Sequence, residues 1–224
     1  MVVVLLLTSL AAQTTPAVVP VAQEPAHHLI LENEWVRVFQ VEVAPHAATL
    51  MHRHDKDYVF VTLGDSEVIS ERQGEKPVTL KLKDGETRFT KGGFAHVARN
   101  LSDKPFHNVT VELVRPAEHG PFNQGRKVMA WEGSGWSQTQ NNLDRVRVTW
   151  TELQPAATLR QHEHNVPHLV IALSDLQLRN EVEAKPPAVF ELKHGDIKWV
   201  PGGFKHSLTN LSTEPARFVA LEFE

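Results

Sequence analysis

The chain has 224 residues, of which 41% are hydrophobic and 22% charged, as in globular proteins that bury a core. A net charge of −4 gives no basic stripe for nucleic acid or for an anionic membrane, so we expect neither partner. The sequence contains no cysteine, which excludes disulfides and sulfur-ligated metals. Thirteen histidines make imidazole, with carboxylate, the strong metal ligand that remains.

Residues 1–28 are predicted to be an export-like, flexible leader. Residues 2–7 form a continuous apolar run, and residues 9–11 have the small-x-small pattern of a cleavage site. The run is too short to span a bilayer, and its departure from a signal peptide is that the first basic residue is Arg37. The pattern predicts a periplasmic or secreted protein, with a mis-assigned start and a cytoplasmic location as the alternative.

The remainder of the chain repeats itself. A shift of 110 residues places the landmarks of the first half on those of the second without a gap, which indicates a tandem duplication. The superposed pairs are His52 and His162, His54 and His164, Gly85 and Gly195, Gly92-Gly93-Phe94 and Gly202-Gly203-Phe204, His96 and His206, and Asn100-Leu101-Ser102 and Asn210-Leu211-Ser212.

Within each repeat the apolar residues alternate with polar ones, as in Val146, Val148 and Trp150, which is typical of β-strands with one buried face. Turn signals recur between the strands, and no long segment has a helical period. We therefore predict an all-β protein, with a sandwich or barrel in each half. The predicted boundaries are 1–28 for the leader, 29–114 for the first barrel, 115–138 for a connector and 139–224 for the second barrel.

Each half carries two histidines two positions apart, followed some forty residues later by a third histidine after a Gly-Gly turn. Residues i and i+2 of a strand point to the same face. A third imidazole from a neighbouring strand would complete a face that a transition metal can occupy. The sequence therefore predicts one three-histidine site formed by His52, His54 and His96, and another formed by His162, His164 and His206.

The second of these motifs has a characteristic spacing, Gly195-x5-Pro201-x-Gly203-x2-His206-x3-Asn210. It resembles the second signature motif of the cupin superfamily at every defining position, and the first half matches with Lys91 in place of the proline. The resemblance covers both repeats and implies a bicupin, with two tandem cupin-type jelly-roll barrels, each a double-stranded β-helix. It also implies one divalent transition metal per barrel, with Fe, Mn, Ni, Zn and Cu all open.

The chain departs from this family at the fourth metal ligand. The family usually places a glutamate three or four residues after the histidine pair, where this chain has Tyr58 in the first half and His168 in the second. We predict an open three-histidine site with Tyr58 at its rim as a candidate catalytic residue, and a second site in which His168 is a fourth ligand. The alternatives are that Tyr58 packs in the core and that His168 only lines its barrel.

Strand parity predicts that the inward side chains near the sites are mostly apolar and include no cluster of Arg and Lys, which favours a small hydrophobic ligand over a polyanion. Histidines outside the two motifs, His27 and His28 among them, are assigned to the surface. The predicted inward residues are Leu50, Phe60 and Thr62 in the first barrel and Val170, Ala172 and Leu208 in the second.

Two functions follow from these sites. The first is an exported metalloenzyme of dioxygenase, lyase or isomerase type that acts on a small organic molecule at a histidine-rich centre. The second is a non-catalytic metal- or small-ligand-binding module, because no acid, base or nucleophile stands clearly beside the histidines. The open coordination predicted for the first barrel favours that barrel for chemistry. The edges of jelly-roll sheets also favour a homodimer.

Overall fold

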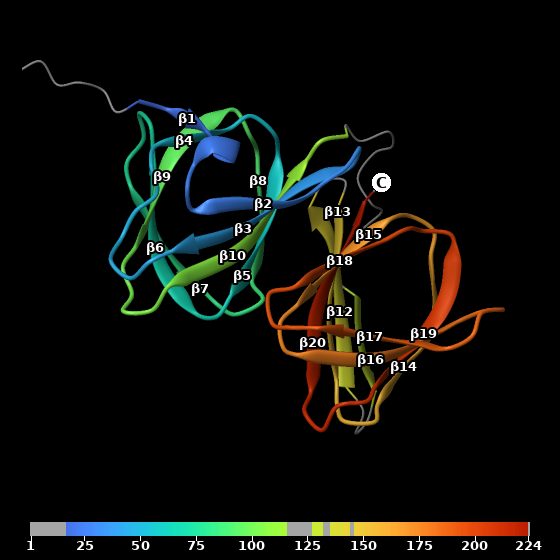
Figure 1. Cartoon of the computed structure of the whole chain (residues 1–224). Coiled ribbons are helices and arrows are strands. Elements are labelled where there is room, and N and C mark those ends of the chain that lie inside the picture. The colour runs from blue at the N-terminus through green and yellow to red at the C-terminus, as the bar shows by residue number, and fades with distance from the viewer. Residues whose placement is uncertain (1–16, 116–126, 132–134, 144–145, 224) are drawn as a thin grey trace, which may run out of the picture.

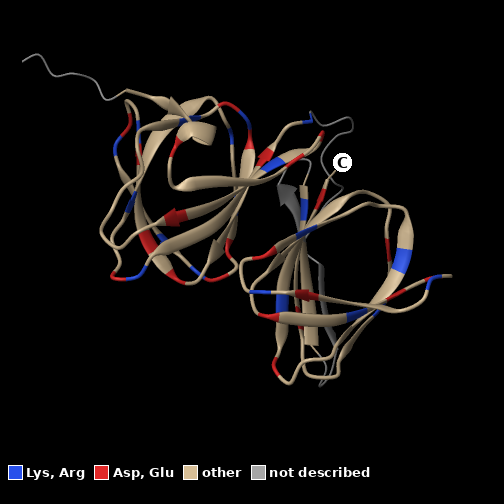
Figure 2. Cartoon of the chain, in the orientation of Figure 1, with Lys and Arg blue, Asp and Glu red and all other residues tan. Residues whose placement is uncertain are grey.

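The computed structural model describes residues 17–115, 127–131, 135–143 and 146–223. It contains two β-barrels that lie side by side, the first drawn from blue to green and the second from yellow to red in Figure 1. Lys and Arg are interspersed with Asp and Glu along both barrels (Figure 2). The regular elements of the described residues are strands, apart from one short 3-10 helix, and no described helix is long and apolar enough to cross a membrane.

The first barrel is made of two five-stranded sheets with the orders β1-β4-β9-β6-β7 and β2-β3-β10-β5-β8. Its elements are β1 (Val19–Pro20), the 3-10 helix η1 (Val21–Gln23), β2 (His27–Glu32), β3 (Val36–Val43), β4 (His52–His54), β5 (Tyr58–Leu63), β6 (Ser66–Arg72), β7 (Val78–Leu82), β8 (Thr87–Thr90), β9 (Phe94–Asn100) and β10 (Phe106–Leu113).

The second barrel has a six-stranded sheet in the order β11-β12-β13-β20-β15-β18 and a four-stranded sheet in the order β14-β19-β16-β17. Its strands are β11 (Lys127–Trp131), β12 (Gly135–Leu143), β13 (Val146–Leu153), β14 (Thr158–His164), β15 (His168–Ala172), β16 (Leu176–Val182), β17 (Ala188–Leu192), β18 (Ile197–Val200), β19 (Phe204–Asn210) and β20 (Ala216–Phe223).

The strand orders of the two barrels correspond, because β12 to β20 follow the same path as β2 to β10. The additions are β1, which pairs in parallel with β4, and β11, which pairs with β12. The predicted all-β fold with cupin-type jelly-roll barrels is confirmed.

The barrels share one hydrophobic core cluster, to which β3, β5 and β10 contribute from the first half and β13, β15 and β20 from the second. Two hydrogen bonds, made by residues at equivalent positions of the two repeats, connect the halves. Gln40 donates to the carbonyl of Gly195 at 3.1 Å, and Trp150 donates to the carbonyl of Gly85 at 2.7 Å. Gln40 and Trp150 occupy the same place in their repeats, so the contact has the self-complementary character of a two-fold interface.

Both repeats begin earlier than the sequence indicated. Val19 pairs with His52, and Val21 is buried in the core of the first barrel, so the flexible leader predicted for residues 1–28 does not extend over this part. The rest of that prediction, residues 1–16, lies outside the described residues. The predicted connector ends inside a strand, because β12 already pairs with β13 from Gly135 onward.

The motif asparagines have a structural role that explains why each repeat carries one. The Asn100 side-chain amide is fully buried and donates to the carbonyls of Val43, Ala44 and Lys104. Asn210 makes the equivalent bonds in the second barrel. Each amide therefore ties the end of one strand, the last residue of β3 or β13, to the loops that follow it and to the loop after the asparagine.

The loop that precedes each histidine pair has a non-glycine residue in a backbone conformation that favours glycine. His46 and Ala156 have φ angles of 57° and 61°, in the left-handed region. A side chain in this region is strained. Glycine would relieve this strain at either position.

Candidate metal centres

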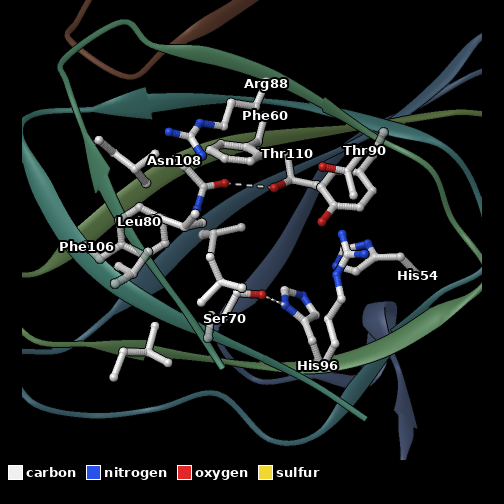
Figure 3. A pocket seen from close by; sticks show the side chains of 18 of the residues that line it. His54, Phe60, Ser70, Leu80, Arg88, Thr90, His96, Phe106, Asn108 and Thr110 are labelled. Atoms are coloured by element: carbon white, nitrogen blue, oxygen red, sulfur yellow. Dashed lines mark hydrogen bonds between the residues drawn. The ribbon is translucent and has the colours of Figure 1, made fainter. Parts of the chain in front are cut away.

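In the first barrel, β4 and β9 place the predicted triad. His52 and His96 are direct partners across the two strands, and their ring centroids lie 4.5 Å apart. His54, two residues further along β4, lies 5.0 Å from His52 and 5.4 Å from His96 by ring centroid. Figure 3 shows His54 and His96 projecting into the same pocket. The three predicted ligands are thus brought together.

The second barrel repeats this arrangement on β14 and β19. His162 pairs with His206 across the strands, and the side-chain nitrogens of His162, His164 and His206 lie within 4.8 Å of one another. The Nε2 atoms of His162 and His206 are 3.0 Å apart. Two metal–nitrogen bonds of about 2.1 Å that meet at a right angle would span about 3 Å, so this spacing suits adjacent ligands of one ion.

Most of the six triad rings have their Nδ1 atom engaged by a neighbouring group. In the first ring of each pair, Nδ1 donates to a main-chain carbonyl, that of Leu50 for His52 and that of Arg160 for His162. In the third ring, Nδ1 contacts a β6 or β16 side chain, Ser70 at 3.2 Å from His96 and Asn180 at 2.8 Å from His206. Such contacts fix the ring orientation and leave Nε2 for a metal.

The remaining ring of each triad faces a glutamate that the sequence analysis missed. Glu222 of β20 accepts a hydrogen bond from Nδ1 of His164 at 2.8 Å, and Glu112 of β10 lies 3.5 Å from Nδ1 of His54. Each carboxylate also pairs with an arginine of the neighbouring strand at 3.2 Å, Arg37 with Glu112 and Arg147 with Glu222. The signal was present in the 110-residue repeat, which conserves both the glutamate and the arginine between the halves.

Burial favours the neutral form of five triad rings, those of His52, His54, His96, His162 and His206. Desolvation is the main cause that lowers the pKa of His52 to about 3, of His96 to about 2 and of His206 to about 3. It likewise lowers the pKa values of His54 and His162. A metal binds the neutral form of imidazole, so these rings need to lose no proton at neutral pH.

The donor set therefore fits a transition metal. In the described part of the chain, the buried Nε2 atoms of His52 and His96 have no hydrogen-bond partner. A buried polar atom without a partner is costly. A metal ion bound by these nitrogens would satisfy them.

Tyr58 and His168 occupy equivalent positions and make the same contact. The Tyr58 ring stacks on His54 at 4.3 Å, and the His168 ring stacks on His164 at 4.0 Å. The two side chains are buried at the start of β5 and β15. His168 lies beside the second triad, and its role as a fourth ligand stays a prediction, as does the catalytic role of Tyr58.

His27 was assigned to the surface from the sequence, and this is wrong. Only 8% of His27 is exposed, and its side-chain nitrogen lies within 4.8 Å of those of His52 and His54. It reaches the site from β2, the strand that the sequence analysis placed at the edge of the leader. Its neighbour His28 is exposed, as predicted.

The pocket of the first barrel has a volume of about 350 Å³ and a mixed lining. Phe60 and Leu80 contribute apolar surface, but Arg72, Lys76 and Arg88 also line it, contrary to the expectation that no cluster of Arg and Lys faces inward. The guanidinium of Arg72 lies 4.0 Å from the centre of the Phe94 ring. Leu50, which was predicted to face inward, is 51% exposed, because it lies before the start of β4 at His52 and the alternation of that strand does not extend to it.

The pocket of the second barrel is larger, about 670 Å³. Its lining includes the predicted inward residues Val170 and Leu208, together with Phe190 and Phe218. The position of Arg72 is taken by Val182, since Arg72 pairs with His96 and Val182 pairs with His206. The two pockets therefore differ in size and polarity around similar triads.

No protein-family model matches the chain, and no curated protein sequence matches it. Solved structures do share its fold. The fold is that of the cupins.

One such structure, described for its Mn(II) centres, is oxalate decarboxylase of Bacillus subtilis. It has a TM-score of 0.63 and 12% identity, and the match covers 86% of this chain and 70% of that one. The same enzyme at pH 4.6 gives a TM-score of 0.65 with 14% identity over 85% and 68% of the two chains. AerE of Microcystis aeruginosa gives a TM-score of 0.63 with 13% identity over 90% and 98%. At these identities the likeness shows the fold alone.

Proposed function

We propose that each barrel binds one divalent transition metal, through His52, His54 and His96 in the first and through His162, His164 and His206 in the second. The observation that carries this proposal is the convergence of imidazoles in both halves. The ligand nitrogens of His162, His164 and His206 lie within 4.8 Å of one another, as do those of His27, His52 and His54, and the His96 ring centroid lies 4.5 Å from that of His52. Neighbouring groups hold the Nδ1 side of several of these rings. A metal so bound would act as a Lewis acid or a redox centre, with Fe, Mn, Ni, Zn and Cu all compatible with imidazole ligands.

We further propose that the first barrel is a catalytic centre of lyase, dioxygenase or isomerase type for a small organic acid. Arg72 supports this choice, because it lines the pocket, is the cross-strand neighbour of His96 in the same sheet, and has no ion-pair partner among the described residues. A guanidinium binds a carboxylate through two parallel hydrogen bonds. The structural likeness to an oxalate decarboxylase, whose substrate is a small dicarboxylic acid, agrees with this substrate class.

Tyr58 would act in this pocket as a hydrogen-bond donor. Burial raises its pKa to about 12, so its hydroxyl keeps its proton at neutral pH and cannot serve as a ready base. Its stacking on His54 places the ring beside the triad. We propose that Tyr58 orients the bound acid rather than removing a proton from it.

The second barrel is the better candidate for the non-catalytic alternative, a metal- or small-ligand-binding module. Its pocket is larger and has Val182 in place of Arg72, so it presents a mainly apolar surface beside its triad. His168 as a fourth imidazole would fill a coordination position there. If such a four-imidazole site also held no exchangeable water, it would favour the binding module, because catalysis needs an open position on the metal.

Elemental analysis of the purified protein tests the metal sites. We expect about two metals per chain in the wild type, and one fewer in His96→Ala and in His206→Ala. His107→Ala, at a histidine outside both sites, is the control. Unchanged metal content in both triad variants would refute the proposal.

The catalytic proposal is tested with oxalate and a panel of other small carboxylic acids. Arg72→Met should keep the metal content of the wild type but weaken turnover at least tenfold, mainly through KM, because the carboxylate loses its partner. The control Arg99→Met removes a cation that pairs with Glu71 instead. Turnover that survives in His96→Ala and disappears in His206→Ala would assign the chemistry to the second barrel.

Two further expectations belong to this proposal. Export is supported by the signal-like residues 2–12, and N-terminal sequencing of secreted or periplasmic protein tests it. A homodimer is supported by β7 and β17, which end their sheets and expose Val78 and Val189. Light scattering tests it, with Val78→Lys expected to give monomers if β7 forms the contact.

A further inference from the structure

A fourth imidazole approaches the first triad from the N-terminal side of the barrel. His27 is the first residue of β2 and pairs with Val41 of β3, so it belongs to the sheet opposite the one that carries the triad. Its ring centroid lies 4.6 Å from that of His52 and 5.9 Å from that of His54. These distances are similar to those within the triad itself.

A buried carboxylate holds this ring. Oε2 of Glu24 is 2.6 Å from Nδ1 of His27, and only 3% of Glu24 is exposed. The same carboxylate accepts hydrogen bonds from the main-chain amides of Ala26 and Leu50. Glu24 is therefore fixed in place, and Nε2 is the nitrogen of His27 that is left for a ligand.

A histidine of the second triad makes the same kind of contact. His164 also gives its Nδ1 side to a buried glutamate, Glu222. A carboxylate that accepts from Nδ1 of a metal-binding histidine sets its tautomer and raises its basicity. Glu24 accepts from Nδ1 of His27 in the same way and would have the same effect on its ring.

The second barrel has no such residue at the equivalent position. Ser137 of β12 occupies the place of His27, pairs with Thr151, and bonds to the Thr151 hydroxyl at 2.7 Å. Its side chain is engaged within its own sheet and is too short to reach a metal at the triad. An imidazole at this position of the sheet is therefore a feature of the first barrel.

We infer that His27 is a fourth ligand of the metal in the first barrel, delivered by the N-terminal strand β2 and oriented by Glu24. The inference rests on the proposed metal site of His52, His54 and His96. It replaces the family's glutamate ligand with an imidazole from another part of the chain, so the centre has four neutral ligands. It also couples the metal to β1, η1 and β2, which pack over the barrel.

The test isolates the first site in a parent protein that carries His162→Ala and His206→Ala. Co(II) is titrated into the metal-free parent, with affinity measured by competition against a chelator and coordination followed by the visible absorption of the ion. Three variants are then made in the parent: His27→Asn, which keeps a donor for Glu24 but loses Nε2, His27→Ala, and His28→Ala as the control on the exposed face of the same strand.

We expect the parent to bind one Co(II) per chain. His27→Asn and His27→Ala should each lower the affinity at least tenfold and change the absorption bands, because the coordination sphere loses a nitrogen. His28→Ala should behave as the parent. Far-UV circular dichroism of the metal-free proteins checks that the variants are folded.

The outcomes separate the two proposals. A parent that binds no Co(II) would overturn the proposed metal site of the first barrel, and this inference with it. A parent that binds Co(II) while His27→Asn retains its affinity and spectrum would overturn this inference alone. A further measurement does not depend on affinity: Co(II) should slow amide hydrogen exchange in β2 of the parent, and should not do so in His27→Asn.

Discussion

The two barrels present the same three-histidine geometry in different surroundings. In the first, His52 and His54 are essentially inaccessible, a fourth histidine stands beside them, and Arg72 lines the pocket. In the second, His162 and His164 are partly exposed beside a larger apolar pocket. Two barrels with the same strand order can thus present similar histidine triads while the residues around them set the charge and the access of each pocket.

The deeper burial of the first triad should appear as a larger dependence of stability on pH. Unfolded histidines take up protons below pH 6.5, whereas His52 and His96 stay neutral in the fold down to about pH 3 and 2. The metal-free protein should therefore be fully stable above pH 6.5 and lose free energy of unfolding as the pH falls, by about 1.4 kcal/mol per pH unit for each such histidine.

Urea unfolding at pH 6.5, 5.5 and 4.5 in the presence of a chelator measures this slope. The double variant His52→Asn/His96→Asn should reduce it by about 2–3 kcal/mol per pH unit. His162→Asn/His206→Asn should reduce it less, because the first of these rings is more exposed. Equal slopes in the two variants would contradict the difference in burial.

The glutamates that face the triads should show the opposite order, because their replacement should lower metal affinity more in the second barrel than in the first. Glu222 bonds to His164 at 2.8 Å, but Glu112 lies 3.5 Å from His54. Glu222→Gln should lower the metal affinity of the second barrel by about 10- to 100-fold, the range typical of residues that support a ligand. Glu112→Gln should have a smaller effect on the first barrel.

Chelator competition in proteins with only one intact triad checks this order. Glu163→Gln, at an exposed position of β14, is the control for the second barrel. A larger loss in Glu112→Gln than in Glu222→Gln would mean that the carboxylate of the first barrel moves onto its histidine when the metal binds.

The interface between the barrels allows a comparison at equivalent glycines. Both Gly85 and Gly195 have positive φ, so alanine is strained at either position. A Cβ on Gly85 would lie 2.6 Å from a methyl of Leu173, but a Cβ on Gly195 would lie 3.2 Å from Leu63. Gly85→Ala should cost about 2–3 kcal/mol of stability and Gly195→Ala about 1–2 kcal/mol. Thermal or urea unfolding of the two variants would show the reverse order if the interface relaxes more easily around Leu173.

The smallest effect is expected at the two positive-φ residues in the loops before the histidine pairs. Ala156→Gly should stabilise the second barrel by about 0.5–1 kcal/mol, because glycine adopts the left-handed conformation without strain. His46→Gly should gain less, because it also removes the 2.8 Å contact between His46 and Asp103. Differential scanning calorimetry would contradict this account if Ala156→Gly lowered the melting temperature.

The fold was predictable because the repeat gives each landmark twice. The period of two, the glycine turns and the spacing to Asn100 and Asn210 depend on neighbours close in sequence or on a register that recurs after 110 residues. The two histidine triads were predictable from the same local spacing and the same 110-residue repeat. The boundaries were less accurate, because Val19 and Gly135 join their sheets through partners far along the chain.

By itself, the sequence determined the all-β fold and the six histidines, since residues two apart on a strand must share a face. The tertiary structure alone decided what surrounds them. Glu112, Arg72 and His27 come from three other strands, and their approach depends on how the two sheets of a barrel close over each other. Strand parity predicts which face of a sheet a side chain takes. Only the packing of the two sheets in the barrel brings a side-chain nitrogen of His27, from the opposite sheet, to within 4.8 Å of one of His52.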